Sequence, residues 1–92
     1  MGIKSTELFH AAEQIQAAVT ATSRLANVTG KKALRDLRRQ VAEQLQDRAN
    51  QVRSWANTLR HHEERGEDIP ADIAWRIQSA TQEFLALAEG GR

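Results

Sequence analysis

The first third of the chain repeats apolar residues at the spacing of an amphipathic helix. Apolar or small residues step by four and three positions through Leu8, Ala12, Ile15, Val19, Thr22 and Ala26. This period places them on one helical face and predicts a helix over residues 6–27. Asn27 and Gly30, with two β-branched residues between them, are typical of a helix end.

A second helical pattern continues much further along the chain. Its apolar positions are Leu34, Val41, Leu45, Val52, Trp55 and Leu59. Neither glycine nor proline occurs between Lys31 and Arg65, so we predict one long helix over residues 31–65. Gly66 suits the left-handed position that follows many helices.

The third pattern begins after a short connection. Asp68 and Pro70 are residues that often start helices. The apolar positions that follow are Ile73, Ile77, Ala80, Phe84 and Leu87. They predict a helix over residues 70–89, which Gly90 and Gly91 would end.

The predicted helix lengths indicate how the chain assembles. At about 1.5 Å per residue, the helices span roughly 33, 52 and 30 Å. Because both connections are short, we predict a single all-α domain over residues 1–92, a small bundle of three antiparallel helices with a long central helix. The two shorter helices then overlap for only about two turns, so one chain encloses little core.

Two assemblies fit these lengths. We favour a homodimer, in which a second copy fills the gaps left beside the long central helix. The alternative is a monomer whose central helix bends at Asn50–Gln51 and closes an ordinary three-helix bundle.

Composition supports the helical class and excludes several kinds of chemistry. The single proline and an aromatic content of 4% leave no room for a β-sheet. The absence of cysteine excludes disulfides, thiol nucleophiles and cysteine-ligated zinc. No stretch approaches the roughly 20 apolar residues of a membrane span, and "MGIKSTELFH" lacks the apolar core of a signal peptide. We therefore expect a soluble cytoplasmic protein with no membrane contact.

Charge is unevenly distributed, although the net charge is only +1. Residues 31–65 hold nine Lys/Arg against five Asp/Glu, whereas residues 66–92 hold two against five. On a helical wheel, a stripe about 60° wide contains Lys31, Arg35, Arg38, Arg53 and Arg60. The stripe predicts a surface for an acidic protein or for phosphates. Alternatively, it is a solvated flank whose arginine stems cover apolar edges and partly pair with acids of the third helix.

Arg48 interrupts the apolar row of the central helix. It precedes Val52 by one turn and Trp55 by two, so its charge must be paired or lie at an edge. In a homodimer it would meet a carboxylate of the second chain, with Val52 and Trp55 beside it in the interface. Exposure at the margin of a bundle is the alternative.

Trp75 lies nearly opposite the apolar row of the third helix. Gln78 and Gln82 share its outer face, and Leu85 lies at the margin of the same patch. A large aromatic side chain among small and amide side chains is typical of an interface anchor. The alternatives are that Trp75 covers its own bundle or packs against a second copy.

The histidines do not form a metal site in this pattern. His61 and His62 are adjacent, so they point about 100° apart on a helix and cannot chelate one ion. Only His61 and Glu64 have a ligand spacing, and no third ligand is aimed at them. Glu7 and His10 match one half of a di-iron motif, but His10 lies off the apolar face. We expect no metal, no cofactor and no enzymatic activity.

The predicted function is therefore a small protein–protein interaction module, an adaptor, inhibitor or regulator of the kind that phages and plasmids carry. It would act through the Trp75 patch and the Arg-rich stripe on a protein with an acidic surface. The alternative is a dimeric nucleic-acid-binding regulator that uses the basic stripe of the central helix.

Overall fold

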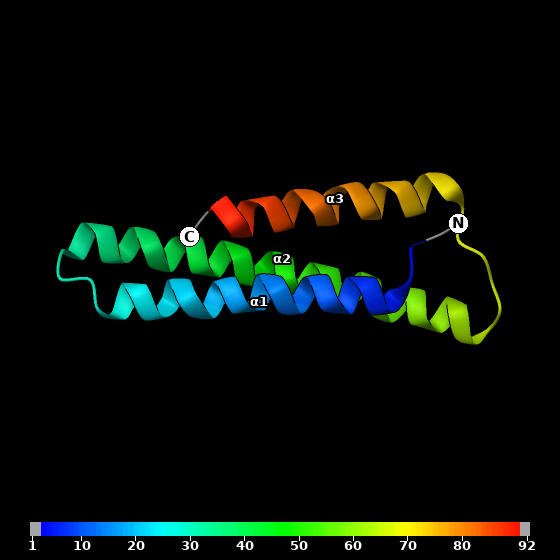
Figure 1. The fold of residues 1–92 in the computed structure, drawn as a ribbon, viewed down its shortest axis with the longest axis horizontal. Coiled ribbons are helices and arrows are strands. Elements are labelled where there is room, and N and C mark those ends of the chain that lie inside the picture. The colour runs from blue at the N-terminus through cyan, green and yellow to red at the C-terminus, as the bar shows by residue number, and fades with distance from the viewer. Residues whose placement is uncertain (1–2, 91–92) are drawn as a thin grey trace.

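The computed structural model describes residues 3–90 and contains three helices with no strand in that range. The helices are α1 (Ser5–Asn27), α2 (Lys32–Glu64) and α3 (Ala71–Gly90), shown in Figure 1. The prediction of an all-helical chain is confirmed. The molecule is a flat rod with extents of 52 × 20 × 14 Å. Within residues 3–90, no helix has the length and apolar character needed to cross a membrane.

Helices α1 and α2 form a long hairpin that contains most of the core. Polar contacts along it join Ser5 to Glu63, Gln16 to Gln46, and Thr29 to Arg38. The start of α1 therefore lies beside the end of α2, and the connection between them forms one end of the rod (Figure 1).

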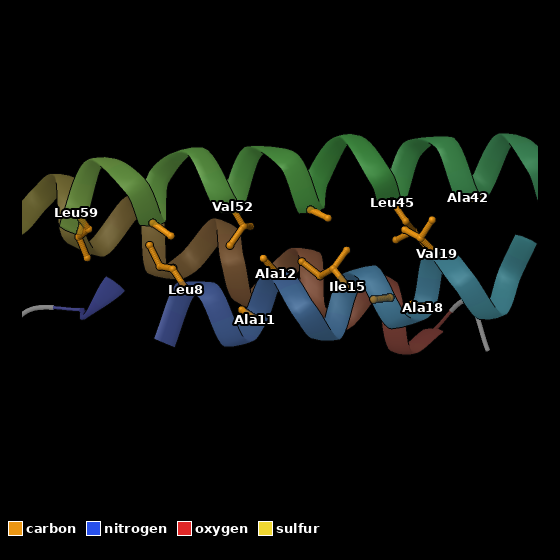
Figure 2. Close-up of a cluster of buried hydrophobic side chains, with 13 residues drawn as sticks. Leu8, Ala11, Ala12, Ile15, Ala18, Val19, Ala42, Leu45, Val52 and Leu59 are labelled. Atoms are coloured by element: carbon orange, nitrogen blue, oxygen red, sulfur yellow. The ribbon is translucent and has the colours of Figure 1, made fainter. Parts of the chain in front are cut away.

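Alanines allow the two hairpin helices to approach closely. Every residue of the apolar row predicted for α1 is buried. On α2 the buried positions alternate between Ala and larger residues: Ala42, Leu45, Ala49, Val52, Ala56 and Leu59. Figure 2 shows Leu8 and Ile15 of α1 pointing between the turns of α2. Small side chains at every second contact leave room for these larger side chains.

Helix α3 packs on the hairpin with part of the predicted face, rotated toward Thr81 and Ala88. These two residues are buried, and the Thr81 hydroxyl donates to the Ile77 carbonyl at 2.8 Å. Ile77 and Phe84 of the predicted row pack against the core. Ile73 and Leu87 of the same row are 45% and 49% exposed, so the prediction is wrong for these two positions.

One aromatic contact holds α3 to α2. The rings of Trp55 and Phe84 are stacked, with centroids 6.0 Å apart and planes inclined by 11°. The guanidinium of Arg48 lies over the same Phe84 ring, 5.6 Å from its centroid. Arg48 also donates from Nη1 to the Gln44 carbonyl at 3.1 Å. Its charge therefore lies at the α2–α3 contact of a single chain.

Helix α2 is continuous through Asn50 and Gln51, which lie well inside its bounds. It ends at Glu64. Two residues later, Gly66 has a φ of 68°, the one left-handed backbone conformation in residues 3–90. The N–H of Gly66 donates to the Glu63 carbonyl, and the N–H of Glu67 donates to the His62 carbonyl. This pair of hydrogen bonds is a Schellman motif, and it reverses the chain toward α3.

We expect Gly66→Ala to lower the free energy of unfolding by about 1 kcal/mol, because an L side chain disfavours the left-handed conformation. A Cβ added there would meet nothing within 4 Å, so backbone strain alone sets the loss. Urea unfolding measures it. The control is Gly30→Ala, which also adds a Cβ in open space but at a residue without positive φ. Equal effects of the two substitutions would contradict this account of the turn.

Candidate interaction surfaces

Among residues 3–90, no three or more His, Asp or Glu side chains come together so that they could hold a metal ion. His62 Nδ1 lies 3.1 Å from Glu67 Oε2, and His61 Nδ1 lies 3.9 Å from Glu64 Oε2. Both histidines therefore contact single carboxylates near the end of α2. Both histidines lie in the last turn of α2, a position where basic side chains are favourable to the helix dipole.

Most arginines of the predicted basic stripe contact their own chain. Arg38 donates to the Thr29 hydroxyl. Arg53 donates to Gln16 Oε1 at 3.0 Å, and the Arg60 guanidinium lies 5.5 Å from the Phe9 ring centroid. These contacts place the stripe along the seam between α1 and α2, where the arginine stems cover apolar edges. The partners belong to α1 and to the connection between α1 and α2. In residues 3–90, no ion pair joins the stripe to the acids of α3.

The free part of the basic charge gathers at the α1–α2 connection. We call this region the basic tip, residues 24–39, whose cations are Arg24, Lys31, Lys32, Arg35, Arg38 and Arg39. Asp36 is the single acid in this segment. Among residues 3–90, none of these six cations forms an ion pair. The basic tip therefore presents unneutralised positive charge to a partner.

The same tip exposes large apolar side chains. The exposed residues there are Leu25, Val28, Leu34 and Leu37, the last of them 56% exposed. A cluster of four large apolar residues at one end is unusual for a monomeric surface, where such residues are usually scattered. Leu34 belongs to the apolar row predicted for the central helix, but it is 39% exposed.

These leucines are uncovered because α3 stops short of the tip. Leu34 and Val41 continue, at a spacing of seven, the row on α2 in which Arg48 and Trp55 contact Phe84. Beyond Phe84, α3 extends about 9 Å, whereas α2 extends about 24 Å from Arg48 back to its start. About 15 Å of the hairpin therefore projects past α3, as Figure 1 shows.

The opposite end of the rod is acidic. We call it the acidic end, residues 61–72, whose acids are Glu63, Glu64, Glu67, Asp68 and Asp72. Arg65 is its single Lys or Arg. Within residues 3–90, Asp68 and Asp72 have no hydrogen bond or ion pair through their side chains. This end therefore carries unneutralised negative charge.

Trp75 lies beside the acidic end and is 67% exposed. A cavity of about 570 Å³ adjoins it between the end of α2, the connection to α3 and the start of α3. Ile3, Leu59 and Ile69 give the cavity apolar walls, while Glu67, Asp68 and Gln78 give it polar ones. Any partner that contacts Trp75 therefore also meets carboxylates, which favours a basic partner here.

The other residues predicted for partner binding differ in their exposure to solvent. Gln78 and Gln82 are exposed on the outer face of α3, as expected for the Trp75 patch. Leu85 is half-buried and packs against the core of its own chain. Trp75 adjoins the end of α2, whereas the basic stripe runs along α2 from Lys31 to Arg60, so only its part near the α1–α2 connection lies far from Trp75.

The three residues predicted for a dimer interface all make contacts inside one chain. Val52 is fully buried between α1 and α2, as Figure 2 shows. Arg48 and Trp55 are partly buried against Phe84 of α3. The fold therefore leaves Val52 no surface to offer a second copy.

A carboxylate at the acidic end also caps α1. The backbone N–H of Ser5 donates to Glu63 Oε2 at 3.0 Å, and the Ser5 hydroxyl donates to Oε1. Lys4, the N-cap residue of α1, makes no side-chain cap. Glu63 thus satisfies an N–H at the start of α1 from the far end of α2.

This cap should be visible in the titration of Glu63. The hydroxyl of Ser5, and then its backbone N–H, lower the pKa of the Glu63 carboxyl, with a smaller contribution from Lys4 against an opposing desolvation. Because the pKa is lowered in the folded state, the ionised cap stabilises the fold above the unfolded pKa. That stabilisation is lost as pH falls through the folded value.

We expect Ser5→Ala to raise the pKa of Glu63 toward its ordinary value of 4.5, because the first of these hydrogen bonds is removed. Stability should then depend less on pH in the acid range. An NMR titration of the Glu63 carboxyl measures the pKa. Thr6→Ala, an exposed neighbour, is the control and should leave it unchanged; an unchanged value in Ser5→Ala would contradict the cap.

Comparisons with known proteins give no match: no family model, no curated protein and no solved structure is significantly similar to this chain.

Proposed function

We propose that the chain is a non-enzymatic protein–protein interaction module, an adaptor, inhibitor or regulator, that binds an acidic helical protein at its basic tip. The observation that carries this proposal is the group of exposed leucines beside unpaired Lys and Arg, where the hairpin projects past α3. The Trp75 patch is its second docking surface, and the carboxylates around it select a basic partner.

The shape of the tip supports a helix as the partner. Beyond the end of α3, the α3-facing side of α2 continues with Val41 and Leu34. A partner helix with an apolar stripe would lie where a longer α3 would have packed, as in helix-in-groove recognition. Acidic side chains flanking that stripe would meet Lys31, Lys32 and Arg35, which favours this partner over a neutral helix.

We expect Lys31→Glu combined with Arg35→Glu to weaken binding of an acidic amphipathic helical peptide by about tenfold or more, because attraction becomes repulsion. Fluorescence anisotropy of the labelled peptide measures the affinity. Leu37→Ala should weaken binding as well, through the apolar contact. Arg76→Glu on α3 is the matched charge control and should have little effect. A peptide with Lys in place of its acids should not bind the tip.

Nucleic acid is the second candidate partner, and the six cations of the basic tip favour it. A short DNA duplex would then bind with an affinity that falls steeply with salt, because each neutralised phosphate releases counterions. Leu37→Ala would leave such binding unchanged, since phosphates make no use of the leucine. Duplex binding tighter than peptide binding, and insensitive to Leu37→Ala, would replace the first proposal with this one.

A further inference from the structure

The two ends of the rod carry opposite charge and are complementary to each other. Residues 24–39 of the basic tip hold six cations against one acid, and residues 61–72 of the acidic end hold five acids against one Lys or Arg, with Lys4 and Arg60 beside Glu63 and Glu64. The two regions lie at opposite ends of a molecule 52 Å long (Figure 1). Each also exposes apolar side chains, with Leu34 and Leu37 at the tip and Ile73 and Trp75 beside the acidic end.

This charge separation opposes the stability of α2 itself. Lys31 and Lys32 stand at the N-terminus of α2, whose first turn contains no acid. Glu64 stands in its last turn, where the helix dipole disfavours an anion. Glu63 in the same turn gains a favourable contact by capping α1. The two lysines have no such compensation, because neither forms an ion pair within residues 3–90. The Glu64 carboxylate lies 4.0 Å from Arg60 and 3.9 Å from His61, so the two lysines are the placement that an acidic partner would offset.

We infer that the basic tip of one copy docks on the acidic, Trp75-bearing end of a second copy, with the two rods antiparallel and side by side. The inference rests on the proposed role of the tip as a docking surface for acidic protein and names the partner as this chain itself. In this arrangement each rod contributes one tip and one acidic end, so the same contact forms twice about a two-fold axis. Such an assembly closes at two copies and leaves no unpaired end.

Area and charge both favour this arrangement over its alternatives. A stable interface takes about 800 Å² from each partner, roughly an eighth of the 6396 Å² surface of this chain. Because the same contact forms twice, each end of the rod has to bury only about half of this area. A dimer formed tip to tip would have only the 15 Å projection to bury, and it would bring two clusters of six cations together.

The decisive experiment reverses the charge of one end at a time. The first variant carries Glu67→Lys, Asp68→Lys and Asp72→Lys, and the second carries Lys31→Glu, Lys32→Glu and Arg35→Glu. Light scattering on a sizing column at low salt should give the wild-type protein a mass of two 10.3 kDa chains. Each variant alone should have the mass of one chain, because like charges then face each other. An equimolar mixture should recover the mass of two chains, because both contacts are again complementary.

Three results would overturn the inference: a wild-type protein of single-chain mass at low salt, a variant that remains two chains by itself, or a mixture that stays at one chain. Circular dichroism checks that each variant is folded. If a reversed variant is unfolded, neutral replacements (Gln for Lys, Arg or Glu, Asn for Asp) are used. Neutral replacements at either end alone should lower the fraction of protein that has the mass of two chains.

Cross-linking tests the antiparallel geometry, since the chain has no cysteine of its own. A mixture of Lys32→Cys and Asp72→Cys proteins should form a mixed disulfide under mild oxidation. Lys32→Cys alone should form none, and a disulfide there would show a tip-to-tip dimer and contradict the inference.

Peptide binding separates this inference from the proposed function. The variant with a reversed acidic end keeps its basic tip, which no second copy now covers. If that variant binds the acidic peptide while the wild-type protein has single-chain mass, the inference fails and the proposed function stands. If the wild-type protein is two chains but this variant binds no acidic peptide, the proposed function fails and self-association stands.

Discussion

Replacing Ile15 by alanine is expected to lower the free energy of unfolding by about 3 kcal/mol. Ile15 is fully buried, and it is among the largest side chains in the seam between α1 and α2. Its neighbours across the seam include alanines, whose short side chains cannot extend to fill the space. A cavity therefore remains, and its cost adds to the lost transfer free energy.

Urea unfolding followed by circular dichroism measures this loss. The matched control is Ile73→Ala, which makes the same chemical change at a residue that is 45% exposed. It should cost about 1 kcal/mol, because roughly half of the side chain is already in water. Similar losses at Ile15 and Ile73 would mean that the hairpin seam is not the main core.

Phe84→Ala is expected to release α3 from the hairpin while α1 and α2 stay folded. Phe84 supplies both the stacked contact with Trp55 and the ring under Arg48. Removing a packed aromatic side chain costs about 3 kcal/mol. The rest of the α3 contact, through Thr81, Ala88, Ile77 and Leu85, is small beside the contact between α1 and α2.

Amide hydrogen exchange measures this effect element by element. Protection should fall throughout α3 and be retained in the middle of α1 and α2. In a Trp75→Phe background, the fluorescence of Trp55 should shift to the red as its ring meets water. Leu87→Ala on the same helix is the control, since Leu87 is 49% exposed. Uniform loss of protection in all three helices would contradict the separate release of α3.

Periodicity predicted α1 well because its buried residues form one stripe that contains the whole predicted row. Leu8, Ile15 and Val19 lie in that row, and all three are buried. Helix α2 contacts α1 and α3 with different residues. Its predicted row merged Leu45 and Leu59, which face α1, with Trp55, which contacts α3.

The small residues of the core were missed for a physical reason. Ala49 and Ala56 are fully buried, but alanine is common on exposed helix faces too, so its presence does not indicate burial. Thr81 is buried because its hydroxyl bonds within its own helix. Whether a buried hydroxyl finds an acceptor depends on the folded geometry, and the spacing of apolar residues in the sequence does not show it.

The candidate surfaces were only partly predictable. The exposure of Trp75 follows from its position opposite the core row of α3. The contacts of Arg53 and Arg60 with α1 depend on how α1 and α2 are rotated relative to each other. A helical wheel of α2 alone cannot predict this rotation. The acidic end was present in the sequence as five acids within residues 61–72, but its relation to the basic tip needs the folded rod.

The most direct test of the docking surface is an NMR titration of leucine methyl groups with the acidic helical peptide. We predict that the methyl signals of Leu34 and Leu37 shift as the peptide binds, while those of the buried Leu8 and Leu59 do not. Shifts confined to the neighbourhood of Trp75, or no shifts at saturating peptide, would contradict the assignment of the tip as the binding surface.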